Sequence, residues 1–186
     1  MRVRVNVITS NEGKFREIRS ALEAGGHEAI WTRITYPEIQ SSSPDEVVGE
    51  SLRWVVRRLV PLEPVLIEDS GIFIDALNGF PGVYSAYVFR TIGNAGILRL
   101  MAGVESRSAS FESRVGFWAP GLGPHIFRGS CRGSIATEAA GSSGFGYDPI
   151  FIPEGEGRTF AQMSLEEKGA LSHRGRALAE LLRFLG

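Results

Sequence analysis

The chain has one cysteine, Cys131, among its 186 residues, so it cannot form an intramolecular disulfide. That composition fits a reducing compartment, where thiols stay unpaired. The N-terminal segment, MRVRVNVITS, lacks the long apolar core of a secretion signal. No apolar run is long enough to cross a bilayer. We therefore expect a cytoplasmic protein with no membrane partner.

The chain also has little net charge. Lysine and arginine together number 20, against 21 for aspartate and glutamate, so the formal net charge is −1. Proteins that bind nucleic acid usually carry an excess of positive charge to neutralise phosphates, and we expect no such partner here. With 186 residues, 43% of them hydrophobic, the chain indicates a single domain over residues 1–186 with a substantial core.

Lysine is scarce as well. Only Lys14 and Lys168 are lysines among the 20 cationic residues. Lysine carries a compact, mobile charge, whereas arginine presents a wide planar fork. Two retained lysines could mark tight sites that grip a phosphate oxygen, or they could reflect drift in composition. Their number alone does not separate these readings.

Hydrophobic periodicity indicates an α/β fold with a mixed sheet and flanking helices. The predicted order is β-α-β-α-β, followed by two antiparallel strands and a terminal helix. The predicted strands are 2–8, 28–34, 65–67 with a continuation over 72–77, 109–118 and 125–135. The predicted helices run from the Asn11 cap to Gly25, from Ser43 to about Val60, over 92–101, after the Ser164 cap, and along the final leucine-rich segment.

The first candidate site is the turn between the first strand and the first helix. Backbone N–H groups at a helix start are unpaired and carry partial positive charge, so they suit an anion. The alternative is an ordinary turn capped by Asn11, with Lys14 in solvent. The segment lacks the spaced glycines of a Walker P-loop. Its residues are Thr9, Ser10, Asn11, Glu12, Gly13 and Lys14.

The second candidate is the acidic segment Glu68-Asp69-Ser70-Gly71 at the end of an apolar strand. Ligands of α/β sheets gather at the carboxyl ends of strands. Carboxylate oxygens suit Mg²⁺, which usually also binds waters and substrate phosphates. Glu38, in an earlier polar loop, could supply a second acid. The alternative is a turn whose aspartate caps backbone N–H groups.

The third candidate is the glycine-rich loop with Phe145, Gly146, Tyr147 and Asp148. Its two aromatic rings could lie on either side of a flat base, or they could simply anchor the loop. The fourth candidate joins Lys168 to Ser172-His173-Arg174. These side chains offer donors that suit the carbonyl oxygens of an oxidised purine. The alternative is a solvated helix end.

Six motifs occur in order over essentially the whole chain, and together they resemble the inosine triphosphate pyrophosphatase family. They are ITSNEGKFREI, YPEIQ, EDSGIFIDALNGFPGVYSAYV, GFGYDPIFIP, TFAQMSLEEK and LSHRGRAL. The resemblance implies Mg²⁺-dependent hydrolysis of ITP, dITP and XTP to the monophosphate and pyrophosphate, which removes deaminated purines from the nucleotide pool. It also implies an elongated mixed sheet, two lobes around a central substrate cleft, and a homodimer.

The resemblance also assigns roles by motif. It implies that residues 9–14 bind the triphosphate and that Glu38 and Asp69 hold the metal. Asp69 matches the proton acceptor for the attacking water, and Ser70 matches a substrate contact. The base-side residues are Phe145, Gly146, Tyr147 and Asp148, with Lys168, His173 and Arg174 closing over the base and its 6-oxo group. One departure is Arg53, since the family often has a lysine in that helix.

Two other functions stay open at this point. A related pyrophosphatase for modified pyrimidine nucleotides would keep the phosphate machinery and change the base pocket. A non-catalytic nucleotide sensor would keep the fold, although the set Glu38, Asp69 and Lys14 argues against it. The sequence leaves open which phosphorus is attacked, how many metal ions bind and how strongly GTP is excluded.

Overall fold

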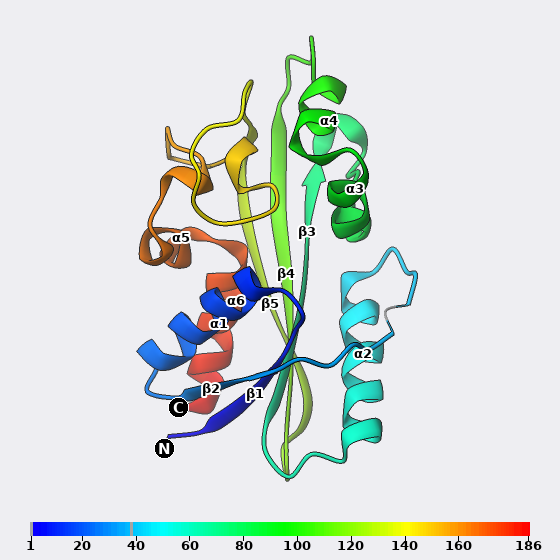
Figure 1. Cartoon of the computed structure of the whole chain (residues 1–186), viewed down its shortest axis with the longest axis vertical. Helices are drawn as coiled ribbons and strands as arrows, with labels where there is room; N and C mark the ends of the chain where they lie inside the picture. Colours follow the sequence, from blue (N-terminus) through cyan, green and yellow to red (C-terminus); the bar gives the residue numbers. More distant parts are fainter. Residues whose placement is uncertain (1, 38) are drawn as a thin grey trace. The chain divides into compact units, whose positions relative to one another are not determined.

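The computed structural model describes residues 2–37 and 39–186 and has an α/β fold around a six-stranded mixed sheet, as predicted (Figure 1). The strand order is β2-β1-β3-β4-β5-β6. The strands are β1 (Arg4–Ile8), β2 (Glu28–Thr32), β3 (Val65–Ile74), β4 (Ser108–Ala119), β5 (Gly123–Ile135) and β6 (Phe151–Pro153). The α-helices are α1 (Glu12–Ala24), α2 (Pro44–Leu59), α3 (Ser85–Thr91), α4 (Gly93–Leu100), α5 (Leu165–Leu171) and α6 (His173–Leu185).

The helix starts follow from local side chains. The Asn11 side chain accepts a hydrogen bond from the backbone N–H of Lys14 at 3.0 Å, which caps α1 as predicted. Ser43 caps α2 in the same way, by accepting from Glu46 N–H. Ser164 begins α5 in a full capping box with Glu167. These three caps were readable because each rests on residues within one turn.

The chain divides into two compact units. Unit 1 contains the chain up to Asp69 together with Ser113–Gly129 and Arg174–Gly186, and unit 2 contains Ser70–Glu112 and Ser130–His173. The boundaries fall inside β3, β4 and β5 and just after the first residue of α6. A single domain over residues 1–186 stays a prediction, as does the central cleft between two lobes.

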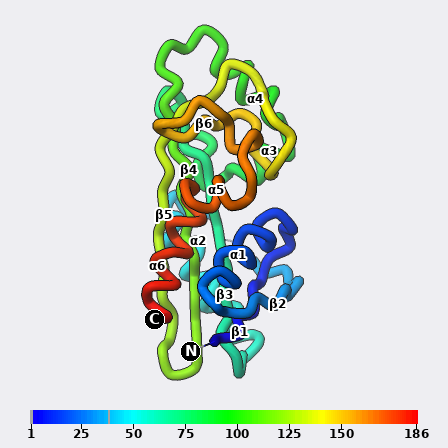
Figure 2. Tube along the Cα trace, turned by 90° about the vertical axis from the view of Figure 1, so that its left-hand side faces the viewer, coloured from blue at the N-terminus to red at the C-terminus, as the bar shows by residue number. Residues whose placement is uncertain are grey.

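In unit 1, helices cover both faces of the strands (Figure 1). On one face, α1 and α6 bury Phe15, Ile18 and Leu178 against β1, β3 and β4. On the other face, α2 packs Leu52 and Val55 against a separate apolar cluster. The start of β1 and the end of α6 lie near each other in this unit (Figures 1 and 2). The leucine face predicted for the last helix is thus part of this core.

In unit 2, aromatic rings form much of the core. Phe111 packs edge-on against Phe151 at 4.7 Å between ring centroids, and Phe160 lies 5.2 Å from Phe151. The loop that follows β5 and the helices α3 and α4 contribute further apolar residues. Tyr147, from the glycine-rich loop, is part of this core, which anchors the loop.

Three predicted details differ from the structure. The apolar strand does not end at Ile67, because β3 continues through the polar segment to Ile74. A Cβ atom at Gly71 would lie 2.3 Å from the carbonyl oxygen of Gly82, so this glycine permits close backbone contact inside a strand. The helix α3 and the short strand β6 were not predicted.

Candidate active site

The acidic pair of unit 1, Glu68 and Asp69, lies at a topological switch point of the sheet. β1 is parallel to β2 on one side and to β3 on the other, so the connections from β1 to β2 and from β2 to β3 run in opposite directions across the sheet. Such switch points are the usual ligand sites of α/β sheets. β1 ends at Ile8, whereas β3 continues through Glu68 and Asp69. The two acids therefore come level with the start of α1, and they lie within a strand rather than in a turn.

Lys14 bridges this helix start to both acids. Its Nζ lies 3.1 Å from Glu68 Oε2 and 3.9 Å from Asp69 Oδ1, and it donates to the Glu68 carbonyl oxygen at 3.3 Å. The side chain of Lys14 is 18% exposed and that of Asp69 is 24% exposed, so a ligand can reach both. The structure thus excludes the reading that Lys14 points into solvent.

The start of α1 also presents backbone donors. Thr9 Oγ1 accepts from Asn11 N–H at 3.1 Å, and Asn11 then caps Lys14 N–H. Among residues 2–37 and 39–186, no hydrogen bond given by the structure uses the N–H groups of Glu12 or Gly13. Two backbone donors and one ammonium group therefore point to an anion at this end of the helix.

Glu68 is almost completely buried, and three side chains surround its carboxylate. Besides Lys14, Ser113 donates to Oε1 at 2.6 Å, and Arg174 Nε lies 3.2 Å from the same oxygen. A buried carboxylate is stable only when cations and donors compensate for its lost hydration. The charge of Glu68 is therefore held in place by fixed partners.

Arg174 is also buried, with a side chain 2% exposed. It forms ion pairs with Glu68 and with Glu17 of α1. Burial alone lowers the pKa of this guanidinium, but the carboxylates of Glu68 and Glu17 outweigh burial and raise it. The structure thus places Arg174, a predicted base contact, within a network of carboxylates in unit 1.

The metal prediction rests on Asp69 and Glu38, and Glu38 lies outside the described residues. Within the described ranges, no group of three or more His, Cys, Asp or Glu side chains gathers as a metal site. Mg²⁺ does not need such a cage, because it commonly binds through one or two carboxylates together with waters and substrate phosphates. The partly exposed carboxylate of Asp69 beside the predicted anion site fits that mode of binding.

In unit 2, the predicted base loop is anchored by two of its own residues. Tyr147 is 5% exposed and donates to the Ser85 carbonyl oxygen at 2.8 Å. Burial raises the pKa of its phenol to about 12, so the hydroxyl stays a donor at neutral pH. Asp148 is 3% exposed and accepts from Phe145 N–H at 2.8 Å. Of the two rings, Phe145 is therefore the one accessible to a ligand.

Lys168 lies beneath this loop. Its Nζ donates to Asp148 Oδ2 at 2.5 Å and lies 4.8 Å from the centroid of the Phe145 ring. Gly144 must be glycine here, because its φ is +72° and a Cβ atom would lie 2.1 Å from Asp148 Oδ2. The structure thus brings together the predicted residues Phe145, Asp148 and Lys168.

The remaining predicted residues of unit 2 are His173 and Ser70. The His173 ring stacks on Phe111 at 4.5 Å with an interplanar angle of 8°, and the side chain is buried. Ser70 is half-buried in β3, next to Asp69. The stacked imidazole therefore has a fixed ring plane, which suits a directional contact.

Some contributors to the site were missed from the sequence. The sequence predicts Glu68 as part of the acidic segment but not its buried contacts with Lys14, Ser113 and Arg174. Glu17 lies three residues after Lys14, which puts both on one helix face. Nothing local marked Ser113, or Asn94, whose side chain donates to the Gly146 carbonyl oxygen at 3.0 Å.

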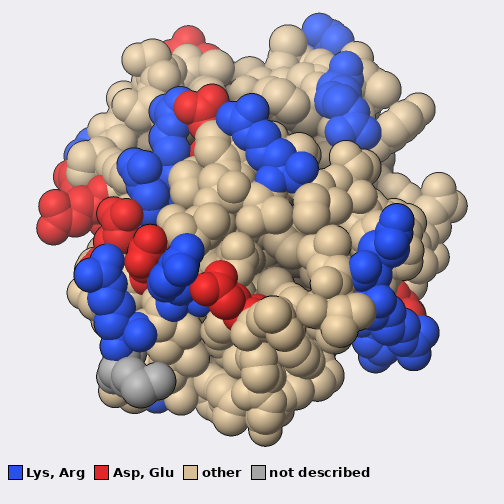
Figure 3. All heavy atoms as spheres, turned by 60° about the horizontal axis from the view of Figure 1, so that its bottom comes forward, with Lys and Arg blue, Asp and Glu red and all other residues tan. Residues whose placement is uncertain are grey.

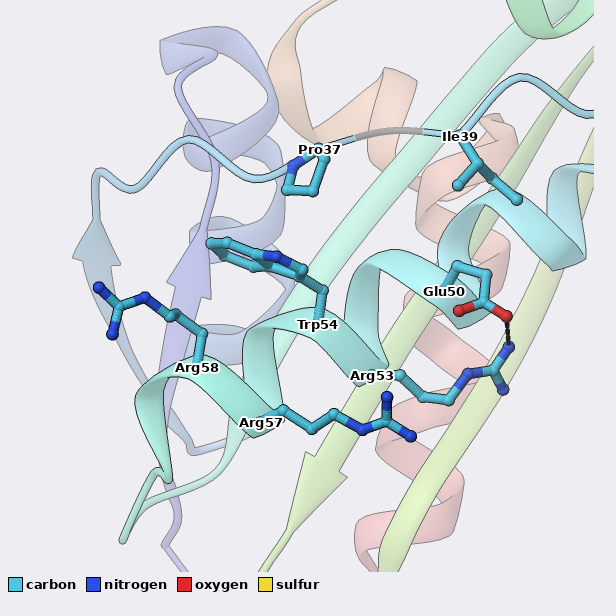
Figure 4. Close-up of a pocket in the computed structure, with 7 residues that line it drawn as sticks. All are labelled: Pro37, Ile39, Glu50, Arg53, Trp54, Arg57 and Arg58. Atoms are coloured by element: carbon cyan, nitrogen blue, oxygen red, sulfur yellow. Dashed lines mark hydrogen bonds and ion pairs between the residues drawn. The ribbon is translucent and has the colours of Figure 1, made fainter.

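Arg53 lies on a different surface, around a groove of about 330 Å³ (Figure 4). Its guanidinium bonds Glu50 one turn back on α2, and Trp54, Arg57 and Arg58 line the same groove. On the molecular face shown in Figure 3, cationic and acidic side chains are interspersed. No helix of the described residues is long and apolar enough to cross a membrane.

Comparisons with known proteins agree with the motif pattern. The Ham1 family model matches residues 5–184. The dITP/XTP pyrophosphatase of Thermococcus kodakarensis is 49% identical over 183 residues, covering 98% of this chain and 97% of the relative. That of Methanopyrus kandleri is 51% identical over 176 residues, covering 95% and 93%.

Solved structures show the same fold. A HAM1 protein from Coxiella burnetii superposes with a TM-score of 0.81 at 32% identity, covering 98% of each chain. A nucleoside-triphosphatase, or dITP/XTP pyrophosphatase, from Mycobacterium abscessus gives a TM-score of 0.71 at 35% identity, covering 96% of this chain and 98% of that one. The family model, the relatives and the fold agree, and the chain belongs to the Ham1 family.

Proposed function

We propose that this enzyme hydrolyses ITP, dITP and XTP to the nucleoside monophosphate and pyrophosphate, with Mg²⁺ as cofactor. The observation that carries the proposal is the cluster of Lys14, Glu68 and Asp69 at the start of α1, in a chain about half identical to dITP/XTP pyrophosphatases. By the family resemblance, residues 9–14 bind the triphosphate, and the base-side residues include Phe145, Lys168 and His173.

Hydrolysis of a phosphoanhydride requires charge neutralisation and a positioned water. Lys14 and the N–H groups of Glu12 and Gly13 neutralise phosphate oxygens. When bound, Mg²⁺ supplies further neutralisation and lowers the pKa of coordinated water. Asp69, with Glu38 as its proposed companion, is the residue to hold that ion.

Asp69 also orients the attacking water. A carboxylate oxygen bound to a cation is a weaker base, so Asp69 acts by positioning or accepts the proton on its second oxygen. Glu68 does not share this task, because Lys14, Ser113 and Arg174 already surround its carboxylate. The two adjacent acids thus have different roles.

Selectivity comes from donors directed at position 6 of the purine. A 6-oxo group accepts hydrogen bonds, whereas the 6-amino group of adenine donates them. In ATP the 6-amino donor would therefore lie opposite the donors of the protein, and neither group would have a hydrogen-bond acceptor. A mismatch of this kind can discriminate by a factor of about 10⁴. His173, held flat on Phe111, supplies such a donor, and Lys168 holds the loop with Phe145 in place through its ion pair with Asp148. The role is removal of deaminated purines from the nucleotide pool.

A homodimer and a cytoplasmic location are part of the same proposal. The first rests on the family resemblance and the second on the single cysteine. Sedimentation velocity at micromolar concentration tests the dimer directly, and a monomer at all concentrations would contradict it.

The function is tested with a panel of ITP, XTP, GTP, ATP and modified pyrimidine triphosphates, with and without Mg²⁺. We expect pyrophosphate release from ITP and XTP, dependent on Mg²⁺. In Asp69→Asn we expect turnover to fall by at least about 10³-fold with an unchanged circular dichroism spectrum. Near-normal turnover in that variant, or tight ITP binding without hydrolysis by the wild type, would sink the proposal.

A further inference from the structure

Trp31 lies outside all six motifs, yet it contacts the segment that forms the proposed triphosphate site. It belongs to β2, the outer strand of the sheet, and pairs with Val7 of β1 in the parallel register. Its indole Nε1–H donates a hydrogen bond of 2.8 Å to the Thr9 carbonyl oxygen. The bond is made where the chain leaves β1 for α1.

Two neighbours fix the orientation of the indole. Its ring stacks on Phe15 at 4.7 Å between centroids, with an interplanar angle of 11°. Phe15 is itself 7% exposed and belongs to the core beneath α1. The guanidinium carbon of Arg33 lies 3.9 Å from the indole centroid. A ring held in this way presents its N–H in one direction only.

The bond from Trp31 is the first link of a short hydrogen-bond series. Trp31 fixes the Thr9 carbonyl, while the Thr9 hydroxyl accepts from Asn11 N–H. The Asn11 side chain then accepts from Lys14 N–H and begins the helix. The position of the N–H groups that meet the anion therefore depends on how Thr9 is held.

We propose that Trp31 is a positioning residue for the triphosphate: its indole N–H orients the Thr9 carbonyl and thereby the anion-binding start of α1. The inference rests on the proposed function for the identity of the ligand. The alternative is a structural role, in which the Trp31 ring only packs against the core side of α1. The two roles make different predictions, since only the positioning role makes phosphate affinity depend on the indole N–H.

The test is Trp31→Phe, which keeps an aromatic ring for stacking on Phe15 and removes the donor. Trp118→Phe is the matched control, because Trp118 is half-buried in the cluster against α2 in the same unit. Inorganic triphosphate with Mg²⁺ is titrated by calorimetry. We expect binding about five- to tenfold weaker in Trp31→Phe, the effect of one hydrogen bond, and unchanged binding in the control.

In the same variant, KM for ITP should rise about as much while kcat stays within about twofold of wild type. Wild-type affinity in Trp31→Phe, or an equal loss in Trp118→Phe, would overturn the inference. A wild-type protein that binds triphosphate but does not hydrolyse ITP would contradict the proposed function and leave this inference standing. Normal ITP hydrolysis by the wild type, together with wild-type triphosphate affinity in Trp31→Phe, would support the proposed function and contradict this inference.

A second measurement does not require the Trp31 variant to fold. The chain has three tryptophans, so Trp54→Phe with Trp118→Phe leaves Trp31 as the sole one. We expect its emission to change in a saturable way as inorganic triphosphate is added, because the ligand acts on the segment that the indole contacts. Emission that stays constant while calorimetry detects binding would overturn the inference.

Discussion

Lys14 and Lys168, the only two lysines, have opposite surroundings. Lys14 is 18% exposed at the start of a helix and lies beside the buried Glu68 carboxylate and the Asp69 carboxylate, which is 24% exposed. The side chain of Lys168 is 3% exposed and forms an ion pair with Asp148, whose side chain is 4% exposed. The ammonium group of Lys14 in unit 1 is therefore accessible to a ligand, whereas that of Lys168 in unit 2 is committed to a buried ion pair.

The difference teaches what each charge can do. A partly exposed ammonium can exchange water for a phosphate oxygen at little cost. A buried ion pair is expensive to separate, because the remaining partner keeps a charge without hydration. Lys168 therefore holds Asp148, and through it the Phe145 backbone, in one conformation. We expect Lys14 to matter for turnover and Lys168 to matter first for stability.

The largest expected effect is on stability. Lys168→Met leaves the Asp148 carboxylate buried without its ammonium partner, so the free energy of unfolding should fall by about 3–5 kcal/mol. In Lys14→Met it should fall by less, about 1–2 kcal/mol, since the buried Glu68 carboxylate keeps Ser113 and Arg174 as partners. Urea unfolding of both variants measures the contrast. Equal losses would remove the distinction between the two lysines.

The next effect is on turnover. Lys14→Arg keeps the charge but puts a wide fork where a compact ammonium lies between Glu68 and Asp69. We expect kcat/KM for ITP to fall about 100-fold, as for a displaced catalytic contact. Arg53→Lys is the matched exchange on a half-exposed side chain bonded to Glu50, and it should change kcat/KM by less than about threefold. Equal, small changes in kcat/KM for the two variants would indicate that the small number of lysines reflects composition and not function.

A smaller effect concerns the anchor of the loop above Lys168. Because the folded pKa of Tyr147 is about 12, above its ordinary value of 10.0, its contribution is complete below pH 10 and is lost as the pH rises toward 12. Tyr147→Phe should be about 1 kcal/mol less stable at pH 7. It should also lack this alkaline decline, which thermal melts across pH 8–12 would reveal. Parallel pH profiles would contradict the buried donor.

The smallest expected effect is on stability and concerns a partly exposed ion pair in unit 1, which serves as a reference for the buried pair of Lys168. Asp45 bonds Arg128 and Arg114, and Arg128 first, then Arg114, hold its pKa below the ordinary 3.8. Its stability contribution is present above that value and is lost as the pH falls through the lowered folded pKa. Asp45→Asn should cost about 1 kcal/mol at pH 7, and the difference should vanish in acid. A cost as large as that of Lys168→Met would show that burial is not what separates the two lysines.

Local signals account for what could be predicted. Asn11, Ser43 and Ser164 cap helices within their own first turns, so the sequence is enough to place those starts. α3 was missed because it is short and has no side-chain cap. β3 was expected to break at its polar residues, but its neighbours in the sheet and the tight contact at Gly71 keep it extended.

The motifs predict several residues that the structure brings together, but not most of their contacts. The motifs placed Lys14 near Asp69, and the structure brings their charged atoms to 3.9 Å. The ion pair between Arg174 and Glu17 could not be foreseen, because the two residues are 157 positions apart in sequence. Trp31 carried no local signal at all, since its importance depends on a parallel pairing and a ring stack.

The most direct test of the proposed phosphate and base roles is the ratio of kcat/KM for ITP to that for ATP in two variants. Lys14→Met removes the proposed phosphate contact, so kcat/KM should fall about equally for both substrates and the ratio should stay near wild type. His173→Phe preserves stacking on Phe111 and removes the ring N–H, so the ratio should fall at least about tenfold. A ratio that collapses in Lys14→Met and survives in His173→Phe would contradict the account.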